Sequence, residues 1–246
     1  MSWTRRFYRE QFAEKDLTYF QVVVKETDLY IGILPQRFSE ALALEVKQLV
    51  AGVRSALEEY IARNPVFLNS LEPIPVDKDM PLIAREMAAA AGLADVGPMA
   101  AVAGAFSDLV GRKLIKYSKD VVVENGGDIY LKRSKRTSVG IFAGNSPFSN
   151  RIALDLTPDL SPLGICTSSG TVGPSLSLGR ADAAVILAET ATLADAVATA
   201  TANRVQDPAD VEQAARFAGT VPGVLGAVVI CGDRLAAWGK VKLRPL

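Results

Sequence analysis

The order in which the predicted elements follow one another limits the fold of this chain more than any other feature. Two β-rich runs, at 18–25 and 28–34, predict a hairpin, and amphipathic helices follow it. A second pair of strands, at 120–124 and 128–132, then flanks an Asn-Gly-Gly turn. The first half therefore follows the order strand pair, helices, strand pair.

Apolar spacing predicts that the first of these helices ends near Arg63. We expect Asp79 to cap the second helix, with Ile83 and Met87 on its buried face. A segment of small residues then leads into a third helical piece, VGPMAAVAGAFSDLVGRKL.

The second half repeats this order more compactly. VGIFAG, RIALDLT and ADAAVILAE are strand-like, ATLADAVATATANRV is helical, and Asp207-Pro208 begins another helix. A closing hairpin is expected around Gly232-Asp233. Two such units predict an α+β fold, a duplicated strand-pair/helix-pair/strand-pair arrangement with sheets backed by helices. We expect one domain, 1–246, with pseudo-repeat halves at roughly 18–137 and 138–246.

Charge and hydropathy exclude several classes of partner. Lys+Arg and Asp+Glu both total 27, so no strong field draws the chain to nucleic acid or anionic lipid. The basic run at 132–136 is expected to be a solvated hairpin tip. The first residues carry no apolar signal region, and no apolar run reaches the length of a membrane span. We therefore expect a cytoplasmic protein without membrane association.

The chain contains no histidine, which limits its chemistry. A His-based triad, a His zinc site and imidazole acid–base catalysis are excluded. Catalysis would have to use carboxylates, hydroxyls, Lys, Arg, Cys, backbone groups or a hard metal. Cys166 is a candidate nucleophile, but no histidine can activate it, and a buried strand cysteine is the alternative.

Asp195 and Thr199 are four residues apart in a predicted helix, so both project from one face among alanines. A carboxylate and a hydroxyl placed in this way suit Mg²⁺, which prefers oxygen ligands. The alternative is a packed alanine-rich helix whose aspartate binds a neighbouring loop.

The segment 97–108, GPMAAVAGAFSD, is unusually rich in small residues. Such residues permit close approach by a helix or by a ligand, and a helix beginning there would offer free N–H groups to an anion. We place Gly97 and Met99 on the ligand side of this segment. Close helix packing is the alternative.

The turn at Glu124-Asn125-Gly126-Gly127-Asp128 carries two carboxylates. A hairpin needs only its Asn-Gly turn, whereas a ligand site would also use the flanking charges. Glu124 and Asp128 are the candidate general bases.

The stretch 164–175, GICTSSGTVGPS, is interpreted as a ligand-side turn that can bind phosphate. It is neither a Walker P-loop nor a Gly-x-Ser-x-Gly elbow. The residues assigned to ligand binding here are Thr167, Ser168, Ser169, Gly170 and Thr171.

Taken together, VGPMAAVAGA, VENGGDIY, CTSSGTVG, SLSLGRADA and ADAVAT resemble the ApbE superfamily, which includes FAD:protein FMN transferases. The resemblance covers roughly residues 20–240 and is closest to a short, uncharacterised cytoplasmic branch. It implies a T-fold-like arrangement. It also implies that Asp195, Thr199 and a carbonyl near Val102 hold a divalent metal. By the same resemblance Gly126, Gly127 and Asp128 lie beside a bound nucleotide, and Ser169 and Gly170 lie near the flavin.

The sequence departs from the flavin transferases at one segment. Their His-x-x-Asp-Pro-x-x-x-Gly motif is replaced here by TVGPSLSLGRADA, which counts against protein flavinylation. Their lysine in the small-residue motif is Ala103 here. We therefore expect a flavin or nucleotide-like ligand bound with Mg²⁺, and metal-assisted phosphoryl or pyrophosphate chemistry if the protein is an enzyme. A non-catalytic small-molecule-binding or interaction protein is the alternative, and a homodimer is left open.

Overall fold

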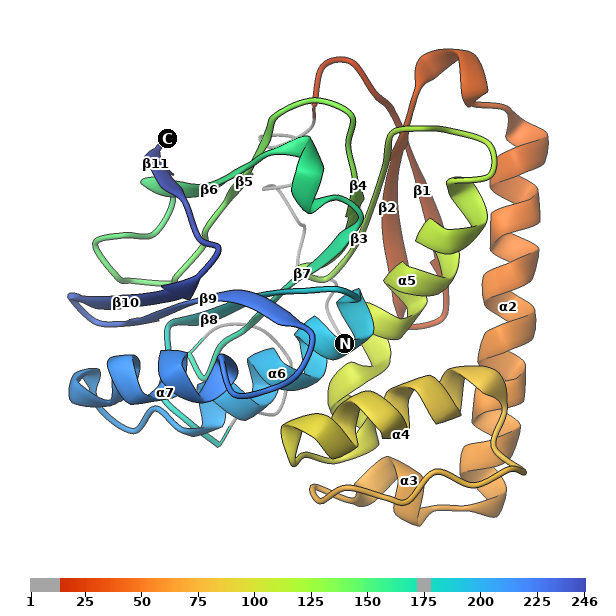
Figure 1. The fold of residues 1–246 in the computed structure, drawn as a ribbon. Coiled ribbons are helices and arrows are strands. Elements are labelled where there is room, and N and C mark those ends of the chain that lie inside the picture. Colours follow the sequence, from red (N-terminus) through yellow and green to blue (C-terminus); the bar gives the residue numbers. More distant parts are fainter. Residues whose placement is uncertain (1–13, 172–177) are drawn as a thin grey trace.

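An antiparallel sheet of eight strands forms the centre of the computed structural model, which describes residues 14–171 and 178–246 (Figure 1). The strand order is β1-β2-β3-β4-β7-β8-β9-β10. The strands of this sheet are β1 Thr18–Val24, β2 Thr27–Ile33, β3 Val121–Asn125, β4 Asp128–Lys132, β7 Leu163–Ser168, β8 Ala183–Ala188, β9 Val224–Cys231 and β10 Arg234–Gly239. A smaller sheet has the order β11-β6-β5, with β5 Thr137–Gly140, β6 Ile152–Leu156 and β11 Leu243–Pro245.

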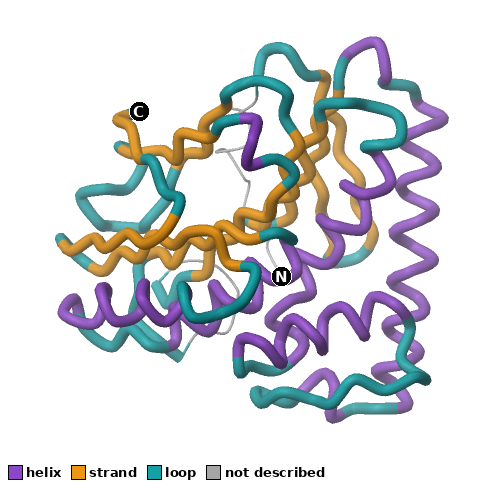
Figure 2. The backbone as a smooth tube through the Cα atoms, in the orientation of Figure 1, coloured by secondary structure: helices purple, strands orange, loops and turns teal. Residues whose placement is uncertain are grey.

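The helices gather on one side of the main sheet (Figure 2). The α-helices are α2 Glu40–Arg63, α3 Val66–Asn69, α4 Leu82–Ala94, α5 Val102–Leu114, α6 Ala191–Asn203 and α7 Val211–Ala218. Short 3₁₀ turns are η1 Pro35–Arg37, η2 Pro98–Ala101, η3 Pro158–Leu160 and η4 Pro208–Asp210. Helices α5 and α6 lie centrally, since α5 contacts β3 and β4 and α6 contacts β7 and β8.

Strand β8 shows how both faces of the main sheet are buried. Its alternate residues Val185 and Leu187 pack against the small sheet, whereas Ile186 and Ala188 pack against the helices. Alternation is expected because successive side chains of a strand point to opposite faces. The sheet therefore lies between a helical layer and a second, smaller sheet, and the prediction of an α+β fold with sheets backed by helices is confirmed.

Most of the predicted elements are present. The hairpin β1–β2, the long helix ending at Arg63 and the closing hairpin β9–β10 form as expected. Asp207 caps η4 through a capping box with Asp210. Strands β1–β4 occupy one half of the main sheet and β7–β10 the other. The division into halves at 137/138 stays a prediction, and this boundary falls within β5.

Several predictions about local structure are wrong. Helix α4 begins at Leu82 after Pro81 and has no side-chain cap, so Asp79 is an exposed loop residue. Residues 163–168 form buried strand β7, which pairs with β4 and β8, instead of a turn. The strand-like runs at 139–144 and 151–157 supply β5 and β6 of the small sheet, so β7 and β8 are the first strand pair of the second half.

The basic run at 132–136 is also not a hairpin tip. It connects β4 of the main sheet to β5 of the small sheet. The Arg133 side chain is only 3% exposed, and its Nη2 lies 2.8 Å from Asp16 Oδ1. An arginine buried in this way needs an acidic partner, which the distant Asp16 supplies.

No single helix in the described ranges is long and apolar enough to cross a membrane; the bent pair Leu82–Ala94 and Pro98–Leu114, at 105°, meets the length and composition criteria only jointly.

Candidate functional site

Hydrogen bonds join four segments near the turn between β3 and β4. Asn125 Nδ2 donates to the Ala103 carbonyl at 3.1 Å, which ties β3 to α5. Ser107 Oγ donates to the Asp128 carbonyl at 2.8 Å, which ties α5 to β4. The Gly104 N–H donates to Asp195 Oδ2 at 2.9 Å, which ties α5 to α6. The structure therefore brings predicted site residues from distant parts of the chain together at the start of α5.

Asp195 serves as a cap for α5 from outside that helix. The residue before α5, Ala101, has no side chain that can accept from the first turn. The Asp195 carboxylate accepts there instead, and Gly104 permits the approach because it lacks a Cβ. A Cβ at Gly104 would lie 2.2 Å from the Ala191 carbonyl oxygen and 2.9 Å from Asp195 Cβ.

Asp108, which was not among the predicted site residues, caps the start of α6 from outside that helix. It is 1% exposed and accepts from Ala191 N at 3.0 Å, Thr192 N at 2.8 Å and Thr192 Oγ1 at 2.6 Å. A carboxylate next to the apolar residues of α5 indicates a buried polar partner, although the sequence does not identify which one.

The carboxylates at this junction favour protonation more than ordinary aspartates do. Burial, together with the nearby Asp128 carboxylate, raises the pKa of Asp195 well above its usual range, against the N–H groups of Gly104 and Ala103. Burial also raises the pKa of Asp108, against its bonds from Thr192 and Ala191. A cation placed among these groups would relieve the cost of keeping them ionised.

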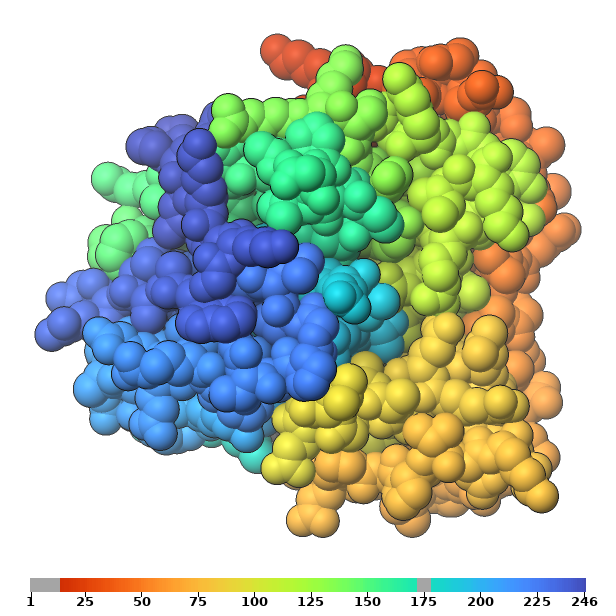
Figure 3. Space-filling view, viewed as in Figure 1, coloured from red at the N-terminus to blue at the C-terminus, as the bar shows by residue number. Residues whose placement is uncertain are grey.

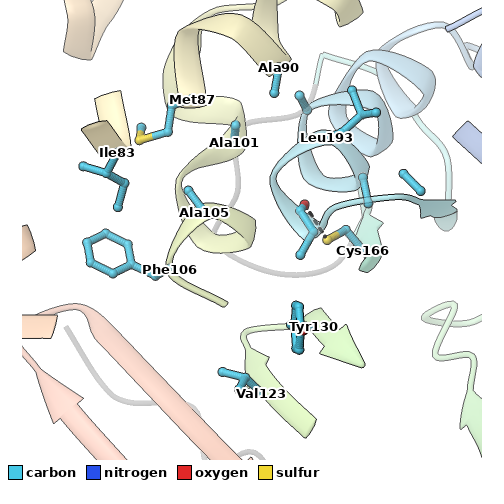
Figure 4. Close-up of a cluster of buried hydrophobic side chains, with 14 of the residues drawn as sticks. Ile83, Met87, Ala90, Ala101, Ala105, Phe106, Val123, Tyr130, Cys166 and Leu193 are labelled. Carbon is cyan, nitrogen blue, oxygen red and sulfur yellow. Dashed lines mark hydrogen bonds between the residues drawn. The ribbon is translucent and has the colours of Figure 1, made fainter. Parts of the chain in front are cut away.

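Cys166 lies in the buried hydrophobic core, close to side chains of the helices and of the main sheet (Figure 4). Its side chain is 0% exposed, and its Sγ donates to the Ala191 carbonyl at 3.2 Å. Burial, with Asp128 and Asp195 nearby, raises the pKa of this thiol well above its usual range. The alternative of a buried strand cysteine therefore describes Cys166, and the thiol is protonated at neutral pH.

The two candidate general bases lie on opposite faces of the sheet. In the β3–β4 register Glu124 is paired with Ile129, and Asn125 is paired with Asp128. Paired residues share a face and successive residues alternate, so Asp128 shares the face of Asn125 while Glu124 points the other way. Glu124 Oε1 also accepts from the Gly127 N–H at 2.8 Å within the turn. Asp128 thus lies on the face of α5 and α6, and Glu124 does not.

The turn itself requires its two glycines. Gly126 has φ 72° and Gly127 has φ 108°, both in the region that side chains disfavour. A two-residue turn with positive φ at both positions matches the twist of the flanking strands. Hairpin geometry alone therefore explains Gly126 and Gly127.

The end of β7 turns back toward β8 through a set of local bonds. Gly170 N donates to the Ala181 carbonyl at 2.9 Å, and Ser169 Oγ donates to the same oxygen at 3.3 Å. Thr171 Oγ1 donates to Asp182 Oδ1 at 2.9 Å. These hydroxyls are thus engaged with protein acceptors. Residues 172–175 of the predicted phosphate-binding turn lie outside the described residues.

Ser168 differs from its neighbours. It is 6% exposed, and its Oγ has no hydrogen-bond partner among the residues that the structure describes. It shares the helix-facing side of β7 with Cys166, whereas Thr167 points to the opposite face. A buried hydroxyl without a partner is uncommon in a folded protein, so we expect a water molecule or a ligand to bind it.

The small-residue segment before α5 is explained by packing. A Cβ at Gly97 would lie 1.8 Å from the Ser70 carbonyl oxygen, so the glycine permits contact with the chain after α3. Met99, in η2, is partly buried and packs against the core. The alternative of close packing therefore describes Gly97.

The residues expected to hold a metal offer only oxygen donors. Asp195 and Thr199 lie one turn apart on α6, and both are partly exposed. Val102 begins α5, two residues before the Gly104 that binds Asp195. Within 14–171 and 178–246 no group of three or more His, Cys, Asp or Glu side chains is arranged to hold a metal ion by itself. One carboxylate, one hydroxyl and one carbonyl fit a Mg²⁺ ion that keeps waters or takes phosphate oxygens.

Comparisons with known proteins identify related sequences. The family model described as AbpE bacteria matches residues 9–230. A UPF0280 protein of Methanocella arvoryzae is 44% identical over 190 residues, 77% of each chain. A UPF0280 protein of Methanococcus maripaludis strain C7 is 39% identical over 232 residues, 92% of each chain.

Two solved structures share the fold. The ApbE protein of Thermotoga maritima has a TM-score of 0.64 at 12% identity, covering 89% of this chain and 96% of its own. The flavin transferase ApbE from Vibrio cholerae has a TM-score of 0.64 at 14% identity, covering 90% and 96%. At such low identity they establish the shared fold alone.

Proposed function

The chain belongs to the family described as AbpE bacteria, and on that premise we propose that it binds a flavin or nucleotide-like ligand together with Mg²⁺. The site is the junction of the β3–β4 turn, the end of β7 and the facing parts of α5 and α6. The single observation that carries the proposal is the convergence of Asp195, Asp128 and the start of α5 at this junction.

The donors at the junction support a hard metal. Asp195 and Thr199 would hold Mg²⁺ with a carbonyl near Val102, and the remaining positions would be filled by water or phosphate oxygens. Bound there, the ion would supply charge neutralisation for a phosphate group. The raised pKa of Asp195 supports a cation as the natural partner of this carboxylate.

Ser168, at the end of β7, supports a ligand contact at this junction. A buried hydroxyl without a partner costs about 1–3 kcal/mol, which a bond to a ligand oxygen would recover. Ser169, Gly170 and Thr171 hold the end of β7 in place by bonds to Ala181 and Asp182. These residues would orient Ser168 toward the ligand.

The reaction class that suits these groups is phosphoryl or pyrophosphate transfer assisted by Mg²⁺. Asp128 shares the face of the junction and would be the carboxylate that accepts a proton, whereas Glu124 lies on the other face. The solved relatives named flavin transferases support a flavin-containing ligand. Without histidine, this chain would have to use a carboxylate wherever an imidazole base would serve.

A thermal-shift screen with FAD, FMN, ADP and ATP, each with Mg²⁺ or with EDTA, tests the proposal. We expect one ligand to raise the melting temperature with Mg²⁺ and to lose most of that effect with EDTA. Incubation with that ligand and chromatography of the products then separates an enzyme from a binding protein. A flat screen with all four ligands would contradict the proposal.

A further inference from the structure

Strand β1 lies at one edge of the main sheet. Among the described strands it pairs only with β2. Its sequence, TYFQVVV, has no charge, no proline and no glycine across seven residues. Native proteins usually protect such edges with charges, prolines or bulges, because a bare edge recruits another strand. An edge of this kind is therefore expected to be covered by another chain.

The β1–β2 register identifies the backbone groups on this edge. Val24 and Thr27 flank the two-residue loop, and the pair that closes such a loop is hydrogen-bonded. Because the direction of bonding alternates along a strand, Tyr19, Gln21 and Val23 direct their N–H and C=O groups away from β2. The Val23 side chain is 40% exposed, and Gln21 is exposed as well.

Helix α2 runs beside this edge and forms one margin of the molecule (Figures 1 and 3). Together they line a shallow groove, whose residues are Gln21, Val22, Val23, Glu40, Ala43, Leu44 and Lys47. Leu44 is 56% exposed at the centre of the helical side. Glu40 and Lys47 flank it, and neither forms an ion pair within the described part of the chain.

We propose that this groove is the interface of a homodimer, with a two-fold axis passing beside Gln21 and Leu44. Both residues line the same groove. A two-fold interface must be self-complementary, because the same patch faces itself. The β1 edge and the α2 face each meet this requirement.

On the strand, an antiparallel pairing centred on Gln21 places Tyr19 of one protomer opposite Val23 of the other. This register uses every outward backbone group of the three residues and forms about six hydrogen bonds. It also creates aromatic–β-branched pairs, which favour strand association.

On the helix, the same axis sets Leu44 against its copy. Glu40 precedes Leu44 by four residues and Lys47 follows it by three, so Glu40 of one protomer faces Lys47 of the other. In the antiparallel arrangement of the two helices, opposite charges therefore face each other. In a parallel arrangement, Glu40 would face Glu40 and Lys47 would face Lys47. The charge pattern of α2 thus favours the antiparallel two-fold arrangement that the pairing of the two β1 strands also requires.

Sedimentation velocity across a range of concentrations tests this interface. The wild type is expected to sediment as a dimer of the 26.2 kDa chain. Glu40→Lys brings like charges together twice per dimer and should raise the dissociation constant about tenfold or more. The exchange Glu40→Lys/Lys47→Glu should return the constant to near the wild-type value, and Arg216→Glu on distant α7 should leave it unchanged.

A backbone variant tests the strand independently of charge. Gln21→Pro removes an outward N–H that β2 does not use, and an edge strand tolerates proline at such a position. It also removes the hydrogen bond from Gln21 Nε2 to Asp28 Oδ1 at 2.6 Å, so Gln21→Ala, which loses that bond but keeps the backbone N–H, is the matched control and should remain a dimer. For Gln21→Pro we expect monomers that retain the wild-type circular dichroism spectrum. A wild type that is monomeric at the highest concentration, a charge exchange that fails to restore the dimer, or folded Gln21→Pro dimers would each overturn the proposal.

Discussion

Asp108 and Asp195 cap one another's helices. Asp108, on α5, accepts three hydrogen bonds from Ala191 and Thr192 at the start of α6. Asp195, on α6, accepts from Gly104 in the first turn of α5. Each carboxylate thereby lies near the positive end of the other helix, where an anion is stabilised. This reciprocal arrangement fixes the two helices that carry the candidate site.

Removal of the Asp108 carboxylate should destabilise the protein. Asp108→Ala leaves the Ala191 and Thr192 N–H groups buried without an acceptor, at an expected cost of about 2–3 kcal/mol. Asp79→Ala, at an exposed residue that caps nothing, should change the free energy of unfolding by less than about 0.5 kcal/mol. Urea unfolding of both variants measures the difference. Equal effects would show that the cap of α6 contributes little.

Gly104 should not tolerate a side chain even though alanine favours helices. The added Cβ of Gly104→Ala would meet the Ala191 carbonyl at 2.2 Å, and we expect a loss of about 1–3 kcal/mol from the forced shift. Gly52→Ala, in α2 with open space around the new Cβ, should stabilise by up to about 1 kcal/mol. Thermal unfolding should show a lower melting temperature for Gly104→Ala and an unchanged or higher one for Gly52→Ala, if α5 and α6 are as close as in the structure.

Cys166 should resist thiol reagents in the folded protein. Its thiol pKa is raised by burial and by Asp128 and Asp195, so ionisation at about pH 8.5, the ordinary thiol pKa, is suppressed. Peptide mass spectrometry after alkylation should find Cys166 unmodified in native protein and fully modified in denaturant. Cys231, which is 7% exposed, should react faster than Cys166. Rapid native alkylation of Cys166 would instead support a reactive thiol.

Ser168→Ala separates a ligand contact from a structural one. The serine hydroxyl has no partner among the described residues, so its removal should leave the stability of the free protein unchanged or raise it by up to about 1 kcal/mol. The melting-temperature shift produced by the bound ligand should fall at the same time. Loss of stability without any change in the ligand-induced shift would assign the hydroxyl to the fold alone.

Local sequence signals predicted most of the elements. Apolar spacing located α2 and the hairpins, and the Asp-Pro pair located the start of η4. Strand β7 was missed because its small and polar residues carry a weak strand signal. Gly164 is required there because a Cβ would lie 2.3 Å from the Ala191 backbone, and that contact is not visible in a local window.

The candidate site was predicted only in part, because some of its contacts join residues that are far apart in the sequence. The helical spacing of Asp195 and Thr199 follows from their numbers. The sequence analysis did not separate Glu124 from Asp128, which the β3–β4 register places on opposite faces. The partners of Asp108 and Arg133, however, lie 83 and 117 residues away along the chain. Tertiary packing selects such pairs, and a single sequence contains no record of them.

Calorimetric titration with FAD, FMN, ADP and ATP in the presence of Mg²⁺, compared between wild type and Asp195→Asn, tests the central claim most directly. The amide still accepts from the Gly104 N–H, so the fold should remain, and Asp79→Asn serves as a control for loss of a negative charge. We predict Mg²⁺-dependent binding in wild type and in the control, weakened about tenfold or more in Asp195→Asn. Binding that is independent of Mg²⁺, equal binding in Asp195→Asn, or no binding to wild type would contradict it.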